Sequence, residues 1–196
     1  MSLQTRVVNI LTRPAEEWRV IASEPATVES LLRDYAAPLA AIPAVCQFIG
    51  YSLVGIPTPI LGTIRIGIGR SLVSAVLAWV FALVGAWIAA VVIEKLAPTF
   101  QSRGDTGQAL KLVVYSMTPV WIAGVLNLVP LLAVLGIIAA LYAVYLFYLG
   151  LPVLMATPGE KVIPYMVVSA LVIIVVSFIL ATITGAIVGI GGMAAF

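Results

Sequence analysis

The first candidates for chemistry are seven residues in the third and fourth of the long apolar stretches, of which six carry a hydroxyl group and one is a proline that frees a backbone carbonyl. They are Tyr115, Ser116, Thr118, Pro119, Tyr142, Tyr145 and Tyr148. Pro119 has no N–H, so the carbonyl of Tyr115 loses its helical partner and we expect a kink there. Such groups could line a pathway for a ligand or an ion. They could equally bond neighbouring helices to one another while the prolines shape the bundle.

The residue types that are missing narrow this chemistry. The sequence has no histidine, which excludes Ser-His-Asp and Cys-His catalysis and histidine-based zinc or haem sites. Its one cysteine, Cys46, lies in an apolar stretch and is expected to be a core residue. All eight acids lie outside the apolar stretches, whereas coupled carriers usually place an ionisable group within a span. We therefore expect no catalytic, cofactor or metal site, and a protein that is not an enzyme.

The elements that must position these residues are five long apolar runs without a charge, namely 36–56, 71–93, 112–129, 131–155 and 162–190. A helix of about 20 apolar residues crosses a hydrocarbon core of about 30 Å. In lipid every backbone polar group must be satisfied within its segment, so these runs should be helices. The 196 residues are therefore predicted to form an all-α polytopic integral membrane protein with five transmembrane helices in one bundle.

The chain is predicted to divide into a cytoplasmic amphipathic segment over 1–34 and a transmembrane domain over 35–196. Apolar residues recur at helical spacing from Leu3 to Leu11, and Pro14 suits the first turn of a second helix. No apolar signal-peptide region is found near the start, so the first span is expected to direct insertion.

Three residues of this segment, Trp18, Arg19 and Arg13, form a candidate cytoplasmic interface. In this interpretation Trp18 lies at the level of the lipid headgroups, and the arginines reach phosphates or a protein partner. The alternative is that the segment packs against the cytoplasmic ends of the bundle.

The placement of basic residues predicts the orientation. Four Lys or Arg residues lie in the N-terminal segment, three between spans two and three, and one between spans four and five, so eight lie on one side. Only two, Arg65 and Arg70, lie on the other side. The positive-inside rule then places the N-terminus in the cytoplasm and the C-terminus outside.

Smaller motifs shape the connections. Alternating isoleucines in the loop 57–70 predict an extended surface segment or a partly buried loop beside span two. Asn127 and Pro130 predict a tight turn that makes spans three and four antiparallel neighbours. The spacing of Gly185 and Gly189 lets two helices approach closely, either within the chain or between two copies.

Several motifs occur in an order and at a spacing that resemble a known family. They are Leu96-Ala97-Pro98-Thr99-Phe100, Gln108-Ala109-Leu110-Lys111, Tyr115-Ser116-x-Thr118-Pro119 and Tyr142-x-x-Tyr145-x-x-Tyr148-x-Gly150-Leu151-Pro152, with Pro14-x-Glu16-Glu17-Trp18 near the start. These resemble the bacterial branch of the Yip domain family, the Ypt/Rab-interacting membrane proteins. The resemblance implies five transmembrane helices and a cytosolic N-terminus. Eukaryotic members associate with Rab-type GTPases, but their Asp-Leu-Tyr-Gly-Pro type motif is absent from this sequence.

From these observations we expect a non-enzymatic scaffold or adaptor in the bacterial inner (plasma) membrane, which organises membrane proteins or the local bilayer. Expected partners are membrane lipids, other membrane proteins, or a second copy of the chain through Gly185 and Gly189. Nucleic acid is not expected, because no Lys or Arg cluster is dense enough to bind it. The alternative is a passive transporter, channel or lipid-moving protein that uses the polar faces of spans three and four.

Overall fold

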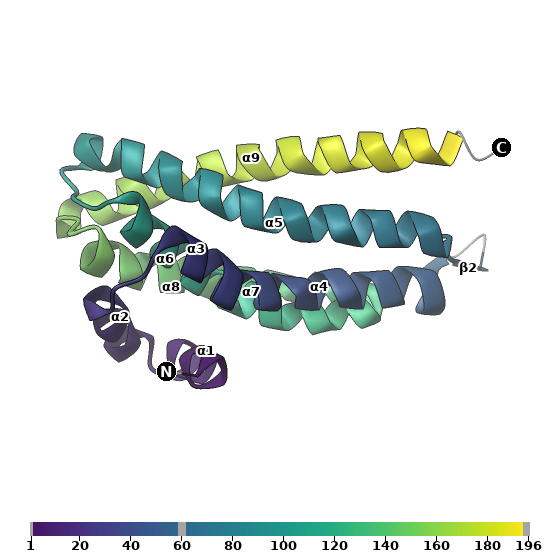
Figure 1. Cartoon of the computed structure of the whole chain (residues 1–196), viewed down its shortest axis with the longest axis horizontal. Helices are drawn as coiled ribbons and strands as arrows, with labels where there is room; N and C mark the ends of the chain where they lie inside the picture. The colour runs from purple at the N-terminus through teal and green to yellow at the C-terminus, as the bar shows by residue number, and fades with distance from the viewer. Residues whose placement is uncertain (1, 59–61, 194–196) are drawn as a thin grey trace.

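The computed structural model describes residues 2–58 and 62–193, and most of them are helical. Within these residues five helical segments are long and apolar enough to cross a membrane, which confirms the predicted fold class. They are Val28–Val54, Ile68–Phe100, Thr106–Leu128, Pro130–Leu154 and Gly159–Ile187. The segments run along the long axis of the molecule, with two short N-terminal helices beside one end and a small β-hairpin at the other (Figure 1).

The N-terminal helices are α1 (Leu3–Thr12) and α2 (Pro14–Ser23), as the apolar spacing predicts. The Ser2 side chain caps α1 by accepting a hydrogen bond of 3.2 Å from the backbone N–H of Thr5. Pro14 opens α2, and two acids follow in its first turn, where they favour the positive end of the helix dipole.

The first span begins earlier than the apolar run predicts. It starts at α3 (Val28–Ser30), where Thr27 and Ser30 form a reciprocal capping box. It continues without interruption through a π-helical segment, η1 (Leu31–Ala36), into α4 (Ala37–Ile49). The predicted boundary between residues 34 and 35 therefore falls inside a helix.

A short excursion separates the first two spans. The span ends in the π-helical segment η2 (Gly50–Val54), and the antiparallel strands β1 (Ile56–Thr58) and β2 (Gly62–Ile64) follow. This hairpin confirms the predicted extended segment, since both sides of β2 are exposed. The chain then enters the long helix α5 (Ile68–Leu96), which ends in the 3₁₀ turn η3 (Ala97–Phe100).

The third and fourth spans form a tight antiparallel hairpin, as Asn127 and Pro130 predict. The expected kink at Pro119 divides the third span at Met117. The pieces of this hairpin are α6 (Thr106–Ser116), α7 (Thr118–Ala123), the 3₁₀ segments η4 (Gly124–Leu128) and η5 (Pro130–Leu135), and α8 (Gly136–Leu154). Gly50 makes room for its turn, because a Cβ at that position would lie 2.1 Å from the carbonyl oxygen of Asn127.

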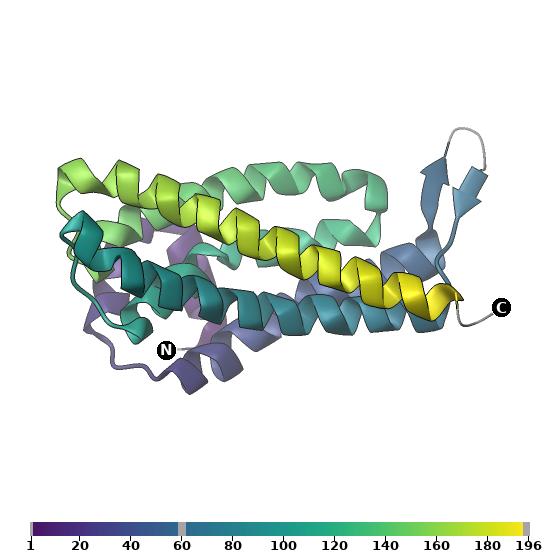
Figure 2. The same cartoon turned by 90° about the horizontal axis from the view of Figure 1, so that it is seen from above.

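The last span, α9 (Gly159–Met193), crosses α5 along one side of the bundle and ends near the β-hairpin, opposite the N-terminal helices (Figure 2). It is the least buried of the five spans: 6% of the residues in its 18-residue apolar stretch are buried inside the protein, against 67% for the third span. The third span is therefore the centre of the bundle. One apolar core joins it to α1 and α2, through Ile10, Trp18 and Ile21.

Candidate functional site

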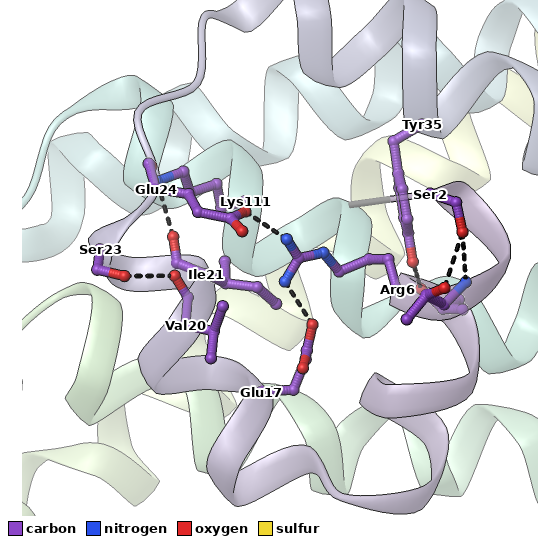
Figure 3. A network of polar contacts seen from close by, with 11 residues as sticks. Ser2, Arg6, Glu17, Val20, Ile21, Ser23, Glu24, Tyr35 and Lys111 are labelled. Carbon is purple, nitrogen blue, oxygen red and sulfur yellow. Dashed lines mark hydrogen bonds and ion pairs between the residues drawn. The ribbon is translucent and has the colours of Figure 1, made fainter.

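The two N-terminal helices are fastened to the bundle around one buried charge, that of Arg6. This side chain of α1 is 5% exposed. Its two terminal nitrogens donate to the carboxylates of Glu17 in α2 and Glu24 just beyond it. The guanidinium carbon lies 5.8 Å from the centroid of the Tyr115 ring in α6. Figure 3 shows the guanidinium between the two carboxylates. Arg6 thus links α1, α2 and the third span.

The surroundings of Arg6 keep it charged. Burial opposes the charged form, but the hydrogen bond to Glu24 and the negative charges of Glu17 and Glu24 outweigh it and hold the pKa of Arg6 above its ordinary value. A guanidinium does not lose its proton in a protein, so the cluster keeps a fixed positive centre. Removal of one partner would leave an uncompensated buried charge.

A second buried cation, Lys111 of α6, holds the C-terminal end of α2. Lys111 is 4% exposed. Its ammonium donates to the backbone carbonyl of Ile21, 3.0 Å away, and to that of Glu24, 2.5 Å away. Cations are favourable at this end of a helix, where carbonyls lack partners. Lys111 lies one residue before the apolar run 112–129, outside the predicted span, whereas α6 begins at Thr106 and includes it as a buried residue.

Trp18 lies in a socket in the bundle and is 0% exposed. The Trp18 ring therefore packs inside the protein rather than against lipid headgroups. The socket exists because residue 150 of α8 is a glycine: a Cβ at Gly150 would lie 2.8 Å from the Trp18 ring and 2.7 Å from Leu112. The edge of the ring also meets Tyr115, with centroids 6.3 Å apart and planes at 85°. The segment thus packs against the bundle, which was the alternative interpretation.

Ser116 and Thr118 of the third span are buried inside the bundle, and one of them is hydrogen-bonded there. Thr118 shares a hydrogen bond of 2.7 Å with the hydroxyl of Tyr35, from the first span. The Tyr35 ring lies 4.4 Å from that of Tyr115, centroid to centroid. Ser116 is buried, and its hydroxyl has no hydrogen-bond partner among the described residues. Together with Pro119, which divides the helix, these residues fix the first span against the third.

This arrangement holds helices together, since its charges and most of its polar atoms are paired with one another. Among the residues that the structure describes, no group of three or more His, Cys, Asp or Glu side chains could hold a metal ion. Here we call the set Arg6, Glu17, Glu24, Lys111, Trp18 and Gly150 the N-terminal lock.

The Yip1 domain matches residues 8–193, which covers almost the whole chain, including α2 and the second half of α1 but not Arg6. The chain belongs to the Yip1 domain family. This confirms the resemblance drawn from the motifs.

Curated relatives of this Yip1-family chain are membrane proteins. It is 26% identical over 151 residues to the inner membrane protein YohC of Escherichia coli (strain K12), a match that covers 76% of this chain and 77% of that protein. The YohC of Escherichia coli O6:H1 (strain CFT073) matches to the same extent. No solved structure matches the chain.

The structure brings the Yip motifs together in space. The Pro14-x-Glu16-Glu17-Trp18 stretch supplies an acid and the ring of the N-terminal lock. Lys111 and Tyr115 come from the second and third motifs, and Gly150 comes from the fourth. Motifs that are separated by more than a hundred residues thus meet where α2 packs against α6 and α8.

The tyrosines of α8 do not line a common cavity with the third span. Tyr145 and Tyr148 are 48% and 43% exposed, so they face away from the bundle. Tyr142 donates a hydrogen bond of 2.7 Å to the backbone carbonyl of Leu11 at the end of α1. The structure therefore does not assemble the predicted face over Tyr142, Tyr145 and Tyr148 into a pathway, and one of these residues serves to hold α1.

The remaining candidates are exposed. Arg13 and Arg19 point away from the core, so an interface there stays a prediction. Gly185 is also exposed, and no atom lies within 4 Å of the place its Cβ would take, so it packs against no described helix. Gly189 lies in the backbone of α9 but outside the residues whose side-chain surroundings are described.

Sequence reasoning missed the charges of the N-terminal lock, although one signal of them was present. Arg6 lies on the apolar face of α1, between Leu3 and Ile10 at helical spacing, where a solvated arginine is not expected. A cation at such a position indicates a buried acidic partner. No comparable local signal marks Lys111 or Gly150, since their partners lie in a distant segment.

Proposed function

We propose that this Yip1-family protein is a non-enzymatic scaffold of the bacterial inner membrane that presents a rigid cytoplasmic surface to other membrane proteins. The observation that supports this most directly is the N-terminal lock. It holds α1 and α2 against the bundle by buried ion pairs and a buried aromatic ring. A segment that merely tethered a partner would not need such an anchor.

The proposed surface consists of the outward side of α2 and the turn before it. Arg13, Glu16 and Arg19 are exposed there, while Glu17 and Trp18 between them are buried. Because the backbone beneath them is fixed, binding a partner would order only side chains, which lowers the entropy lost on association. Mixed charges favour a polar and specific partner surface over a purely lipidic one.

The proposed orientation has the N-terminal helices in the cytoplasm. Eight of the ten Lys and Arg residues lie in the segments at this end of the bundle, as the positive-inside rule requires for a cytoplasmic face. The β-hairpin and the end of α9 lie at the opposite end (Figure 2). The relative YohC is named as an inner membrane protein, which supports the same membrane for this chain.

A non-enzymatic role is supported by the chemistry that the chain offers. The sequence has no histidine. Its buried cations, Arg6 and Lys111, each have partners that fix α1 and α2, so neither is free to act on a substrate. The alternative of a passive pathway along spans three and four has less support, because Tyr145 and Tyr148 point outwards and Tyr142 is bonded to α1.

Photocrosslinking in living cells tests the proposed scaffold function. A photoreactive residue is placed at position 19, on the proposed surface, and at Val175, which is 57% exposed on α9. We expect discrete protein adducts from position 19, which disappear when Arg13 is changed to Glu, and mainly lipid adducts from position 175. The proposal is wrong if position 19 gives no protein adduct, or if its adducts persist in Arg13→Glu.

A further inference from the structure

A groove on the other side of the third span carries polar groups that the N-terminal lock does not use. It lies between α4, α5, α6, α7 and α9 and has a volume of about 410 Å³, within the range of pockets that bind small molecules. Most of its lining is apolar, but Gln47 of α4, Ser74 of α5, and Ser177 and Thr184 of α9 also line it. Three spans thus contribute polar side chains to one space inside the bundle.

Three of these four side chains have no hydrogen-bond partner among the described residues. Thr184 donates to the carbonyl of Leu180 in its own helix, 2.9 Å away. Gln47 and Ser74 make no side-chain hydrogen bond with any described residue. Water in the hydrocarbon layer is scarce, so an amide with no partner is expensive there. The groove is therefore built for a molecule that supplies hydrogen-bonding groups.

The side of α5 that faces the groove explains which kind of molecule fits. Residues three and four apart on a helix share a face, and Ser74, Ala78, Ala82, Gly85 and Ala89 all line the groove. Their small side chains leave a narrow apolar channel along the helix. The polar side chain of Ser74 therefore lies at one end of a channel that is suited to a hydrocarbon chain.

A positive charge stands at the mouth of this channel. Arg70 lies four residues before Ser74, on the same face of α5 and about 6 Å further out along the axis. It is exposed, as is Arg65 on the segment before it. The sequence has no Asp or Glu between residues 35 and 93 or between 106 and 159, so no acidic side chain of the described residues lies at this end of the bundle. Neither arginine forms an ion pair with a described residue.

We propose that this groove binds one anionic phospholipid from the leaflet at the hairpin end. The phosphate lies at Arg70, the glycerol ester groups bond to Gln47 and Ser74, and an acyl chain fills the channel along Ala78, Ala82 and Gly85. Along a phospholipid, the charged phosphate is followed by ester groups and then by hydrocarbon chains. Along α5, an arginine is followed by a polar residue and then by small apolar residues, so the two orders match. This site lies apart from the proposed scaffold surface and goes beyond that function.

The test counts phospholipids retained by the purified full-length protein in native mass spectrometry, with phosphatidylglycerol or phosphatidylcholine titrated into the detergent. We expect one phosphatidylglycerol to bind about fivefold more tightly than phosphatidylcholine, because an arginine near a headgroup of net negative charge contributes about that factor, while the choline cation offsets the phosphate charge of phosphatidylcholine. Arg70→Ala should remove this preference. Arg19→Ala is the matched control, since it removes an exposed charge at the opposite end and should leave the preference unchanged.

Two further variants separate the parts of the site. Gln47→Leu keeps the size of the side chain and should weaken both lipids, while Ala78→Leu should block the channel and abolish retention. Equal retention of both lipids by the wild type would overturn the proposal, as would equal losses in Arg70→Ala and Arg19→Ala. A dimer that Ala78→Leu dissociates in the absence of lipid would show instead that a second copy fills the groove. Loss of the photocrosslinks at position 19 would affect only the scaffold proposal.

Discussion

The two ends of the bundle use similar polar residues in opposite ways. At the N-terminal end, Arg6 and Lys111 are buried and each has partners within the chain. At the hairpin end, Arg70 is exposed, and Gln47 and Ser74 line a groove without a hydrogen-bond partner among the described residues. A polar group in a membrane protein is either satisfied by the fold or available to something else. The first end is therefore structural, and the second awaits a ligand.

The helices that carry these two sites also differ in how deeply they are buried. The third span, which carries Lys111 and Tyr115, is the most buried of the five, while the last span, which lines the groove, is mostly exposed to lipid. In lipid, apolar surface gains nothing by being buried against another apolar helix, so packing and polar contacts decide which helix is central. The span with the most internal polar contacts became the core.

The largest effect should come from breaking the buried ion pair. We expect Arg6→Ala to lower the free energy of unfolding by about 3–5 kcal/mol, because it leaves the Glu17 carboxylate buried without a counter-charge. Arg70→Ala, at the exposed end, should change it by less than about 0.5 kcal/mol. Thermal unfolding in detergent measures both, and trypsin cleavage after the exposed Arg19 reports whether α2 has detached.

A double variant separates charge from packing in this first comparison. Arg6→Met with Glu17→Leu removes the charge pair and keeps apolar volume, so it should recover most of the loss. If Arg6→Ala and Arg70→Ala destabilise equally, the contrast between the two ends is wrong. If the double variant is less stable than Arg6→Ala alone, the explanation of the Arg6→Ala loss by an unpaired buried carboxylate is wrong.

The sequence predicted the larger features well and these contacts poorly, for physical reasons. Five spans follow from length and the absence of charge, and the break at Met117 follows from the missing N–H of Pro119. Local rules of this kind need no knowledge of the fold. Lys111 and Ile21 are ninety positions apart in the chain, so no local pattern indicates that one bonds the other.

Trp18 illustrates a second reason. An aromatic residue on an amphipathic helix suits both the headgroup level of a membrane and a socket in a protein. Which of the two occurs depends on whether another helix offers a cavity of the right shape. Here Gly150 provides it, and a glycine in a transmembrane helix is too common to predict such a contact by itself.

The second prediction concerns Lys111. We expect Lys111→Met to destabilise the protein by about 1.5–3 kcal/mol, because the carbonyls of Ile21 and Glu24 lose a charged donor while the apolar stem is kept. Lys95→Met is the control, since Lys95 is exposed near the end of α5 and should have little effect. Amide hydrogen exchange over α2 checks the location, because only Lys111→Met should loosen the end of that helix.

The third prediction tests the socket of Trp18. Gly150→Ala should destabilise the protein by about 1–3 kcal/mol, because the added methyl would lie 2.8 Å from the ring and force it to move. Gly136→Ala in the same helix is the matched control, since nothing lies within 4 Å of its added methyl. Tryptophan fluorescence should change for Gly150→Ala alone. An equal response of both variants would show that Trp18 does not depend on this glycine.

The smallest effect is expected for the hydrogen bond between Tyr35 and Thr118. Losing this bond should destabilise the protein, whereas losing the Gln47 amide at the other end should not. A double-mutant cycle with Tyr35→Phe and Thr118→Val should give a coupling of about 0.6 kcal/mol, the average for such bonds between transmembrane helices. Gln47→Leu at the other end removes an amide that bonds to no described residue, so in lipid-free detergent it should leave the protein as stable or make it more stable. If Gln47→Leu destabilises the lipid-free protein more than Tyr35→Phe does, its amide is held by the fold, and the two ends are alike after all.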